Sequence, residues 1–188
     1  MFVRSWMSSP AVVLPGATPV ADALEYMAIR KIRRIPVVQD GGLGGIVTRS
    51  DLQTINARHA GTGHTGKVLL ADVMKTPVLT VAPDETLEHA SKIMLDHEVS
   101  GLPVMDGGRI VGMITESDIF EAFNEIMGTA ESGARVVMTV PADTQLLDSL
   151  RRRLKGLAIR SLATYRGDDG KDWEVVVKVC GRKPAPAV

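Results

Sequence analysis

Apolar and polar positions follow a pattern that occurs twice along the first two thirds of the chain. In the first copy, an apolar run before Pro15 predicts a short strand. The next apolar residues fall at helical spacing: Val20, Ala23, Leu24, Met27 and Ala28. Two short apolar runs, 35–38 and 45–48, then flank the turn QDGGLG and predict a β-hairpin. With a second helix from Ser50 toward His59, the expected unit is β-α-β-β-α.

The second copy repeats this unit 67 positions later, without a gap. WMSSPAVV aligns with VMKTPVLT, IPVVQDGG with LPVMDGGR, and GIVTRSDL with GMITESDI. Identical pairs on this diagonal include Met7/Met74, Pro10/Pro77, Met27/Met94, Gly45/Gly112 and Asp51/Asp118. A strand before Pro83, a helix over 87–95, strands over 102–105 and 110–115, and a helix from Ser117 toward Met127 are therefore expected. Such agreement on one diagonal indicates a tandem duplication.

The last 60 residues follow a different order. RVVMTV reads as a strand, and DTQLLDSLRRRLKG as a helix capped by Asp143 or Thr144 and ended by Gly156. LAIRSLATY and WEVVVKV read as two strands joined through RGDDGKD. We expect an α+β fold with a first repeat at 1–60, a connector at 61–68, a second repeat at 69–128 and a small β-α-β-β unit at 129–188.

Composition and charge narrow the class of protein. Of 188 residues, 45% are hydrophobic, and 22 Lys and Arg balance 22 Asp and Glu, which argues against a disordered chain. Balanced charge also predicts no general attraction to nucleic acid or to an anionic membrane. One cysteine excludes an intrachain disulfide framework and suits a reducing compartment. No apolar run is long enough for a signal peptide or a membrane span, so a cytoplasmic protein is expected.

The stretch GTGHTGKV, 61–68, matches most of a P-loop. A P-loop needs a preceding strand and a Ser or Thr after its lysine to hold Mg²⁺. Position 68 is Val, and the expected preceding element is the second helix of the first repeat. A connector between the repeats is therefore the better interpretation.

The T-x-S-D motif closes each hairpin and opens each second helix. One interpretation is helix capping by Ser50 and Ser117, with Asp51 and Asp118 favoured by the helix dipole. The other is ligand binding, because free N–H groups and a hydroxyl at a helix start can receive phosphate oxygens. The carboxylate would repel phosphate, so it belongs at the ribose end of a nucleotide. The two roles are compatible.

These motifs, with RRIPVV and SGLPVM upstream, resemble the CBS-domain pair, or Bateman module, over residues 1–128. The resemblance implies a cleft that binds adenosine-containing ligands. It implies ribose contacts for Asp51 and Asp118. The hydroxyls near ribose or phosphate would be those of Thr48, Ser50, Thr115 and Ser117. Relatives that bind nucleotides use basic residues before the proline for phosphate, a role that falls on Arg33 and Arg34. The alternative for these arginines is a solvated strand start.

The two copies differ in charge around this motif. Repeat two has Ser100 and Gly101 in place of Arg33 and Arg34, and Glu116 in place of Arg49. We therefore expect preference for a polyphosphate to depend mainly on Arg33, Arg34 and Arg49 of the first copy.

No catalytic constellation is evident. The four histidines, His59, His64, His89 and His97, lack metal-ligand spacing, and Cys180 has no base beside it. No catalytic residue, metal site or enzymatic activity is predicted. The β-α-β-β order of the last 60 residues resembles the first part of an ACT domain, without its second helix and fourth strand. The order CBS, CBS, ACT resembles the acetoin-utilisation protein family of bacteria.

The prediction is a non-catalytic regulatory protein that senses AMP, ADP, ATP, S-adenosylmethionine or a dinucleotide. A ligand-free structural module for dimerisation or partner docking is the alternative. The expected partners are a second copy in a homodimer and a regulated enzyme or transporter, with neither nucleic acid nor membrane.

Overall fold

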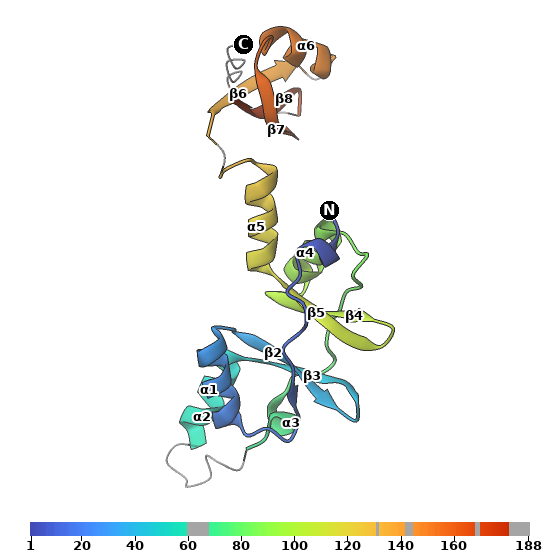
Figure 1. Ribbon diagram of the computed structural model, residues 1–188, viewed down its shortest axis with the longest axis vertical. Coiled ribbons are helices and arrows are strands. Elements are labelled where there is room, and N and C mark those ends of the chain that lie inside the picture. Colours follow the sequence, from blue (N-terminus) through green and yellow to red (C-terminus); the bar gives the residue numbers. More distant parts are fainter. Residues whose placement is uncertain (60–67, 131, 142–144, 168–169, 181–188) are drawn as a thin grey trace, which may run out of the picture. The chain divides into compact units, whose positions relative to one another are not determined.

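The computed structural model of the protein (Figure 1) describes residues 1–59, 68–130, 132–141, 145–167 and 170–180. The chain forms two compact units, Met1–Ile119 and Phe120–Val188. Helices and sheets occur in both, so the expected α+β class is confirmed. Of the predicted connector 61–68, only Val68 lies within the described residues.

The first repeat has the predicted order of elements. After the short 3-10 helix Val3–Ser5, it comprises β1 (Leu14–Pro15), α1 (Val20–Arg30), β2 (Arg34–Gln39), β3 (Gly42–Thr48) and α2 (Arg49–His59). β1 lies parallel to β2, which pairs antiparallel with β3. Of the five positions at helical spacing, helix α1 buries Val20, Ala23 and Met27, whereas Leu24 is half-buried and Ala28 is exposed.

The second repeat follows the same order with one difference. A short helix α3 (Leu70–Val73) precedes α4 (Leu87–Asp96), β4 (Gly101–Asp106), β5 (Arg109–Thr115) and α5 (Glu116–Ile126). The strand expected before Pro83 is reduced to one parallel bridge between Val81 and Val104. That bridge is the counterpart, 67 positions on, of the Leu14–Val37 pairing in the first repeat.

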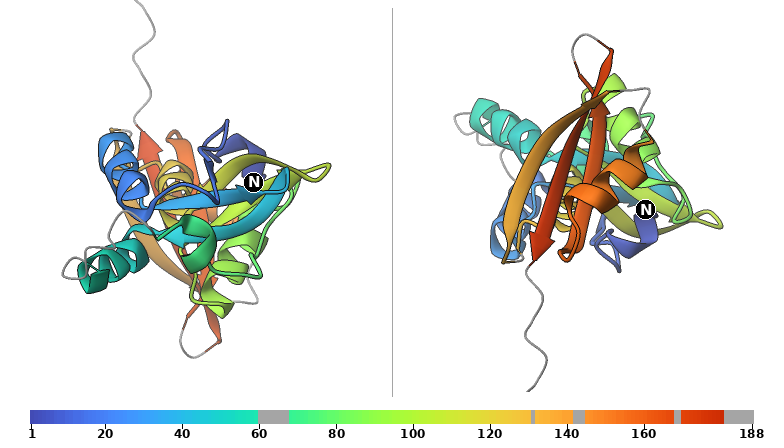
Figure 2. Two further views of the ribbon diagram at one scale, coloured as in Figure 1. Left: turned by 90° about the horizontal axis from the view of Figure 1, so that it is seen from below. Right: turned by 90° about the horizontal axis from the view of Figure 1, so that it is seen from above.

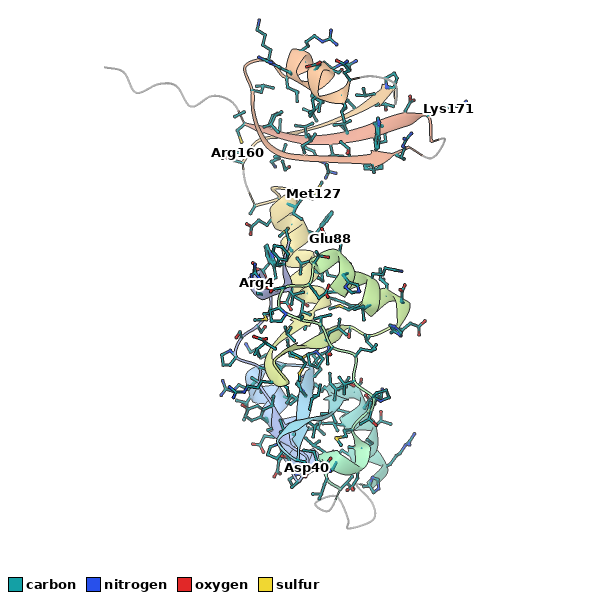
Figure 3. The ribbon with its side chains drawn as sticks, turned by 90° about the vertical axis from the view of Figure 1, so that its right-hand side faces the viewer. Arg4, Asp40, Glu88, Met127, Arg160 and Lys171 are labelled. Atoms are coloured by element: carbon teal, nitrogen blue, oxygen red, sulfur yellow. The ribbon has the colours of Figure 1, made fainter. Side chains whose placement is uncertain are left out.

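The first segment of each repeat pairs with the other repeat. Ser8 exchanges two backbone hydrogen bonds with Met113 of β5, of 2.9 and 3.0 Å. Lys75 does the same with Ile46 of β3, at 2.9 and 3.1 Å. The N-terminal segment accordingly lies beside α4: Arg4 contacts Asp84, and the terminal amino group lies 3.8 Å from Glu88 Oε2 (Figure 3). Neither repeat is completed by its own consecutive residues.

Two equivalent glycines let these crossing segments approach. A Cβ on Gly112 would lie 2.7 Å from the carbonyl oxygen of Ser8 and 2.8 Å from Met7 Sδ. A Cβ on Gly45 would lie 2.5 Å from Met74 Cγ. The aligned pairs Met7/Met74 and Gly45/Gly112 therefore make two equivalent contacts, in which the methionine of each repeat packs on the glycine of the other.

After the end of α5, the described part of the second unit is a three-stranded antiparallel sheet with a helix packed on it. Its elements are β6 (Ala134–Pro141), α6 (Leu146–Arg153), β7 (Ala158–Arg166) and β8 (Asp172–Cys180), in the order β6-β8-β7. Helix α6 covers one face of the sheet (Figure 2). The core of this unit comprises Val140, Leu150, Leu154, Val175, Val177 and Val179. The predicted caps Asp143 and Thr144 lie outside the described residues.

Candidate ligand site

Each T-x-S-D motif lies where the last hairpin strand of a repeat meets its second helix. Thr48 immediately precedes α2; its hydroxyl donates to Asp51 Oδ2 at 2.7 Å and accepts from the Asp51 N–H at 3.3 Å. In the second repeat, the N–H and the hydroxyl of Thr115 both donate to Asp118 Oδ2, each at 2.7 Å. The motif therefore ties each threonine to its aspartate.

The capping roles expected of Ser50 and Ser117 are wrong by two positions. The helices begin at Arg49 and Glu116, so both serines lie inside the first turn. The residue that reaches the free N–H of the first turn is the one just before the helix, here Thr48. Ser50 and Ser117 are exposed at the helix starts, with Ser50 Oγ 3.0 Å from the Thr48 hydroxyl.

Asp51 has a second hydrogen-bond partner, a lysine from outside its own motif. Lys75 Nζ lies 3.0 Å from Asp51 Oδ2. Partial burial alone would raise the pKa of Asp51, but hydrogen bonds from Thr48 and Lys75 and the charge of Lys75 outweigh it, so this pKa lies below its ordinary value. The residue 67 positions before Lys75 is Ser8, which carries no charge. The two carboxylates thus have different electrostatic surroundings.

Arg34 extends from the first repeat onto the second. Its guanidinium donates to Ser100 Oγ, and a Cβ on Gly101 would lie 2.7 Å from its Nη1. Gly101 is the counterpart of Arg34, so the space of one missing side chain holds the other copy's arginine. Burial first, and then the charge of Arg33, lower the pKa of Arg34, while the carboxylates of Glu116 and Asp118 raise it. Arg34 is therefore electrostatically coupled to the second motif.

A first pocket, the Ser8 pocket, has a volume of about 220 Å³. It is lined by Ser8, Pro10, Ala11, Val12, Lys31, Ile32, Arg33, Arg34, Met113, Thr115 and Ser117. The crossing N-terminal segment supplies an apolar wall through Pro10 and Val12. The second motif supplies hydroxyls, and the strand start supplies cations. Such a pocket suits a ligand with one flat apolar part and one polar or anionic part.

A second pocket, the Arg49 pocket, has a volume of about 340 Å³ and a different lining. Its walls are Arg33, Arg34, Thr48, Arg49, Ser50, Gln53 and Ser100. Its three guanidinium groups and three hydroxyls suit an anion, and the hydroxyls of Thr48 and Ser50 lie at the start of α2. Arg33 and Arg34 line both pockets.

The structure thus gathers most of the predicted site residues around these two pockets. Thr48, Ser50 and Arg49 line one, and Thr115 and Ser117 line the other. Asp51 and Asp118 are held beside them through their threonines. Sequence reasoning missed the pocket residues of the crossing segment, from Ser8 to Val12, and it missed Lys75. The sequence signal that could have revealed Lys75 is the difference in charge between Ser8 and Lys75, which align when the two repeats are superimposed.

The described residues also bear on metal sites and membrane spans. In that part of the chain, no group of three or more His, Cys, Asp or Glu side chains is arranged to hold a metal ion. None of the described helices is long and apolar enough to cross a membrane.

Comparison with known proteins identifies both repeats. The CBS domain family matches residues 3–56 and 70–125. Among curated proteins, the CBS domain-containing protein YhcV of Bacillus subtilis is 32% identical over 122 residues, which cover 64% of this chain and 84% of YhcV. An inosine-5'-monophosphate dehydrogenase of Thermoplasma acidophilum is 34% identical, but the match covers only 19% of that enzyme. The chain spans a small part of such enzymes.

Solved structures resemble the chain over a similar range. The CBS domain pair of protein MJ0100, in complex with 5'-methylthioadenosine and S-adenosyl-L-methionine, has a TM-score of 0.58 and 27% identity over 65% of this chain and 99% of that one. CBSX2 in complex with AMP has a TM-score of 0.57 and 28% identity, covering 66% and 97%. An acetoin utilization protein (AcuB) from Vibrio cholerae has a TM-score of 0.59 and 30% identity, covering 71% and 98%.

Proposed function

Because this chain belongs to the CBS-domain family, we propose that it is a non-catalytic regulatory protein that senses an adenosine-containing ligand, of the AMP, ADP, ATP or S-adenosylmethionine type. The Ser8 pocket carries the proposal: an apolar wall, two hydroxyls of the second motif and two arginines converge on one space. Similar pairs solved with AMP and with S-adenosyl-L-methionine support the adenosine class.

The proposed pose follows from the chemistry of the lining. The apolar wall of Pro10 and Val12 would receive the adenine, and Asp118 would accept hydrogen bonds from the ribose hydroxyls. Arg33 and Arg34 would face the phosphates, with Arg49 reached from the neighbouring pocket. Asp51, with Thr48 and Ser50, would form the equivalent ribose subsite of the first copy.

A thermal-shift screen of adenosine, AMP, ADP, ATP and S-adenosylmethionine tests the proposal, with guanosine as the matched control. A ligand at one hundred times its Kd should stabilise the native state by about 2.7 kcal/mol and raise Tm accordingly. The double variant Asp51→Ala, Asp118→Ala should lose the shift and keep the far-UV circular dichroism spectrum. Absence of a shift with all five ligands in the unaltered protein would contradict the proposal and favour a structural module.

We also propose how the chain is organised and where it works. The repeats extend over 1–60 and 69–128, and residues 129–188 form an ACT-like unit, as in the acetoin-utilisation family. The strand order β6-β8-β7 with a covering helix supports the ACT-like unit. The similarity to AcuB, over 71% of this chain, supports the acetoin-utilisation family for the repeats. The single cysteine of the chain supports a cytoplasmic location. The partner that the protein regulates in response to its ligand would be an enzyme or a transporter.

Association into a homodimer is part of the same proposal. Strand β6 is paired with β8 along one edge, and Val137 on it is 56% exposed. On α5, Phe120 and Phe123 are 66% and 55% exposed. An open strand edge and exposed aromatic side chains both favour covering by another chain. Deleting residues 132–188 should weaken the assembly and spare nucleotide binding; a monomer at high micromolar concentration in light scattering would contradict the dimer.

A further inference from the structure

The two aspartates of the repeated motif differ in what lies in front of them. We infer that Lys75 makes the ribose subsite at Asp51 the weaker of the two, so that a nucleoside fills the Asp118 subsite first. This inference rests on the proposed adenosine-binding function and assigns Lys75 as the residue that makes the two subsites unequal.

The partners of Asp118 Oδ2 come from within its own motif. Both donors belong to Thr115, the N–H and the hydroxyl, at 2.7 Å each. They hold the carboxylate from the end of strand β5. The crossing segment contributes Ser8, an uncharged residue that lines the pocket beside Thr115 and Ser117. The charge that acts on Asp118 is that of Arg34, whose guanidinium donates to Ser100 Oγ. A ribose approaching from the pocket therefore meets a carboxylate that the crossing segment does not engage with a cation.

The partners of Asp51 Oδ2 come from two sides. Thr48 donates from within the motif at 2.7 Å, and Lys75 Nζ lies 3.0 Å away from the crossing segment. Lys75 pairs with Ile46 by backbone hydrogen bonds, just as Ser8 pairs with Met113, so the two occupy equivalent places. The Lys75 ammonium therefore approaches Asp51 from the place that corresponds to Ser8 at the second motif, where Ser8 lines a pocket.

This geometry disfavours ribose at Asp51 for a chemical reason. A ribose diol is recognised when its two hydroxyls donate to a carboxylate with free acceptor positions. Oδ2 of each motif aspartate already accepts two hydrogen bonds, so the difference lies in charge: at Asp51 one of the two donors is the Lys75 ammonium, which neutralises the negative charge that strengthens hydrogen bonds from a ribose. The ammonium is well exposed, so its effect is moderate: displacing an exposed ion pair corresponds to a loss of up to about five-fold in affinity.

Adenosine is the sharpest probe, because it presents the ribose without phosphates that Lys75 would attract. In isothermal titration calorimetry, the unaltered protein should show two unequal adenosine sites. Lys75→Ser, which copies Ser8, should tighten the weaker site by about five-fold. Ser8→Lys should weaken the stronger site by a similar factor, and Lys75→Arg should behave as the unaltered protein. Asp51→Asn in the Lys75→Ser background should remove the gained affinity and thereby assign it.

The outcomes separate the two claims. Two equal adenosine sites in the unaltered protein, or no change in Lys75→Ser and Ser8→Lys, would overturn the role of Lys75 and leave the adenosine-binding function standing. Absence of adenosine, AMP and ADP binding in every variant, with circular dichroism unchanged, would overturn the proposed function and this inference together. Tightening in Lys75→Ser that persists with Asp51→Asn would also overturn it, because the gain would then arise elsewhere.

Discussion

The two repeats are alike in their backbone contacts and unlike in the charges beside their motifs. The contacts of Met7 with Gly112 and of Met74 with Gly45 have the same form, and so do the bridges of Ser8 and Lys75. By contrast, Asp51 of the first repeat faces Lys75. Arg34, also of the first repeat, lies over Gly101 of the second. One duplicated scaffold can therefore hold two pockets of different chemistry.

The largest effect should come from the equivalent core positions of the two repeats. Ile35 and Leu102 occupy equivalent places and are 0% and 1% exposed. Ile35→Ala and Leu102→Ala should each lower the free energy of unfolding by about 2–5 kcal/mol, because each leaves a cavity. Trp6 fluorescence in a Trp173→Phe background would follow the first unit in urea. A large loss of unfolding free energy in only one of the two variants would show that the two core positions are not equivalent.

The next effect concerns ligand affinity and separates the motifs. Asp118→Asn should weaken adenosine binding by about 1.5–3 kcal/mol, because the ribose loses a charged acceptor. Asp51→Asn should weaken the overall binding much less, since Lys75 already engages that carboxylate. Calorimetry on the two matched variants measures both. Equal losses would mean that the motifs act alike.

The glycine contacts should differ in a graded way. Gly112→Ala and Gly45→Ala should each cost about 1–3 kcal/mol of unfolding free energy through overpacking. The cost should be greater at Gly112, because its Cβ would meet the backbone oxygen of Ser8, whereas Gly45 faces a methionine side chain. Urea unfolding tests the order. A greater loss at Gly45 would show that Met74 is the more rigid neighbour.

Arg34 offers a smaller test that depends on ligand charge. Arg34→Ala should weaken ADP or ATP binding by about five- to ten-fold and adenosine binding less, because only the nucleotides present phosphate. Glu116→Arg should strengthen ATP binding by adding a cation at the second helix start. Equal losses for ADP, ATP and adenosine would assign Arg34 a structural role, through Ser100 and Gly101.

The smallest effect is a pH dependence of stability. The pKa of Asp51 is lowered in the folded state, so its stabilisation is present above the ordinary value of about 3.9 and is lost as pH falls through the folded pKa. The free energy of unfolding should therefore fall by a few tenths of a kcal/mol more in the unaltered protein than in Asp51→Asn between pH 5 and pH 2. Lys75→Ser should show an intermediate fall. Identical profiles in all three would mean that the ion pair contributes nothing.

The repeats and their helices were predictable because periodicity and turn residues are local signals. Helix α1 and strands β2 and β3 lie where the apolar pattern places them. The exchange of segments was not predictable, because the local sequence around Met7 and Ser8 carries no signal for pairing with a strand 105 positions later. The motif threonines and serines were found because both copies carry them. Lys75 was not found, because it comes close to Asp51 only through the exchange of segments between the repeats.

The exchanged segments have a consequence for how the chain acquires its fold during synthesis. Ser8 leaves the ribosome more than a hundred residues before Met113, its backbone partner. The first hairpin likewise waits for Lys75 before its outer strand is bonded on both sides. Because distant closures slow folding, the nascent first repeat should stay incompletely protected until the second emerges. The two repeats would then fold as one cooperative event rather than in turn.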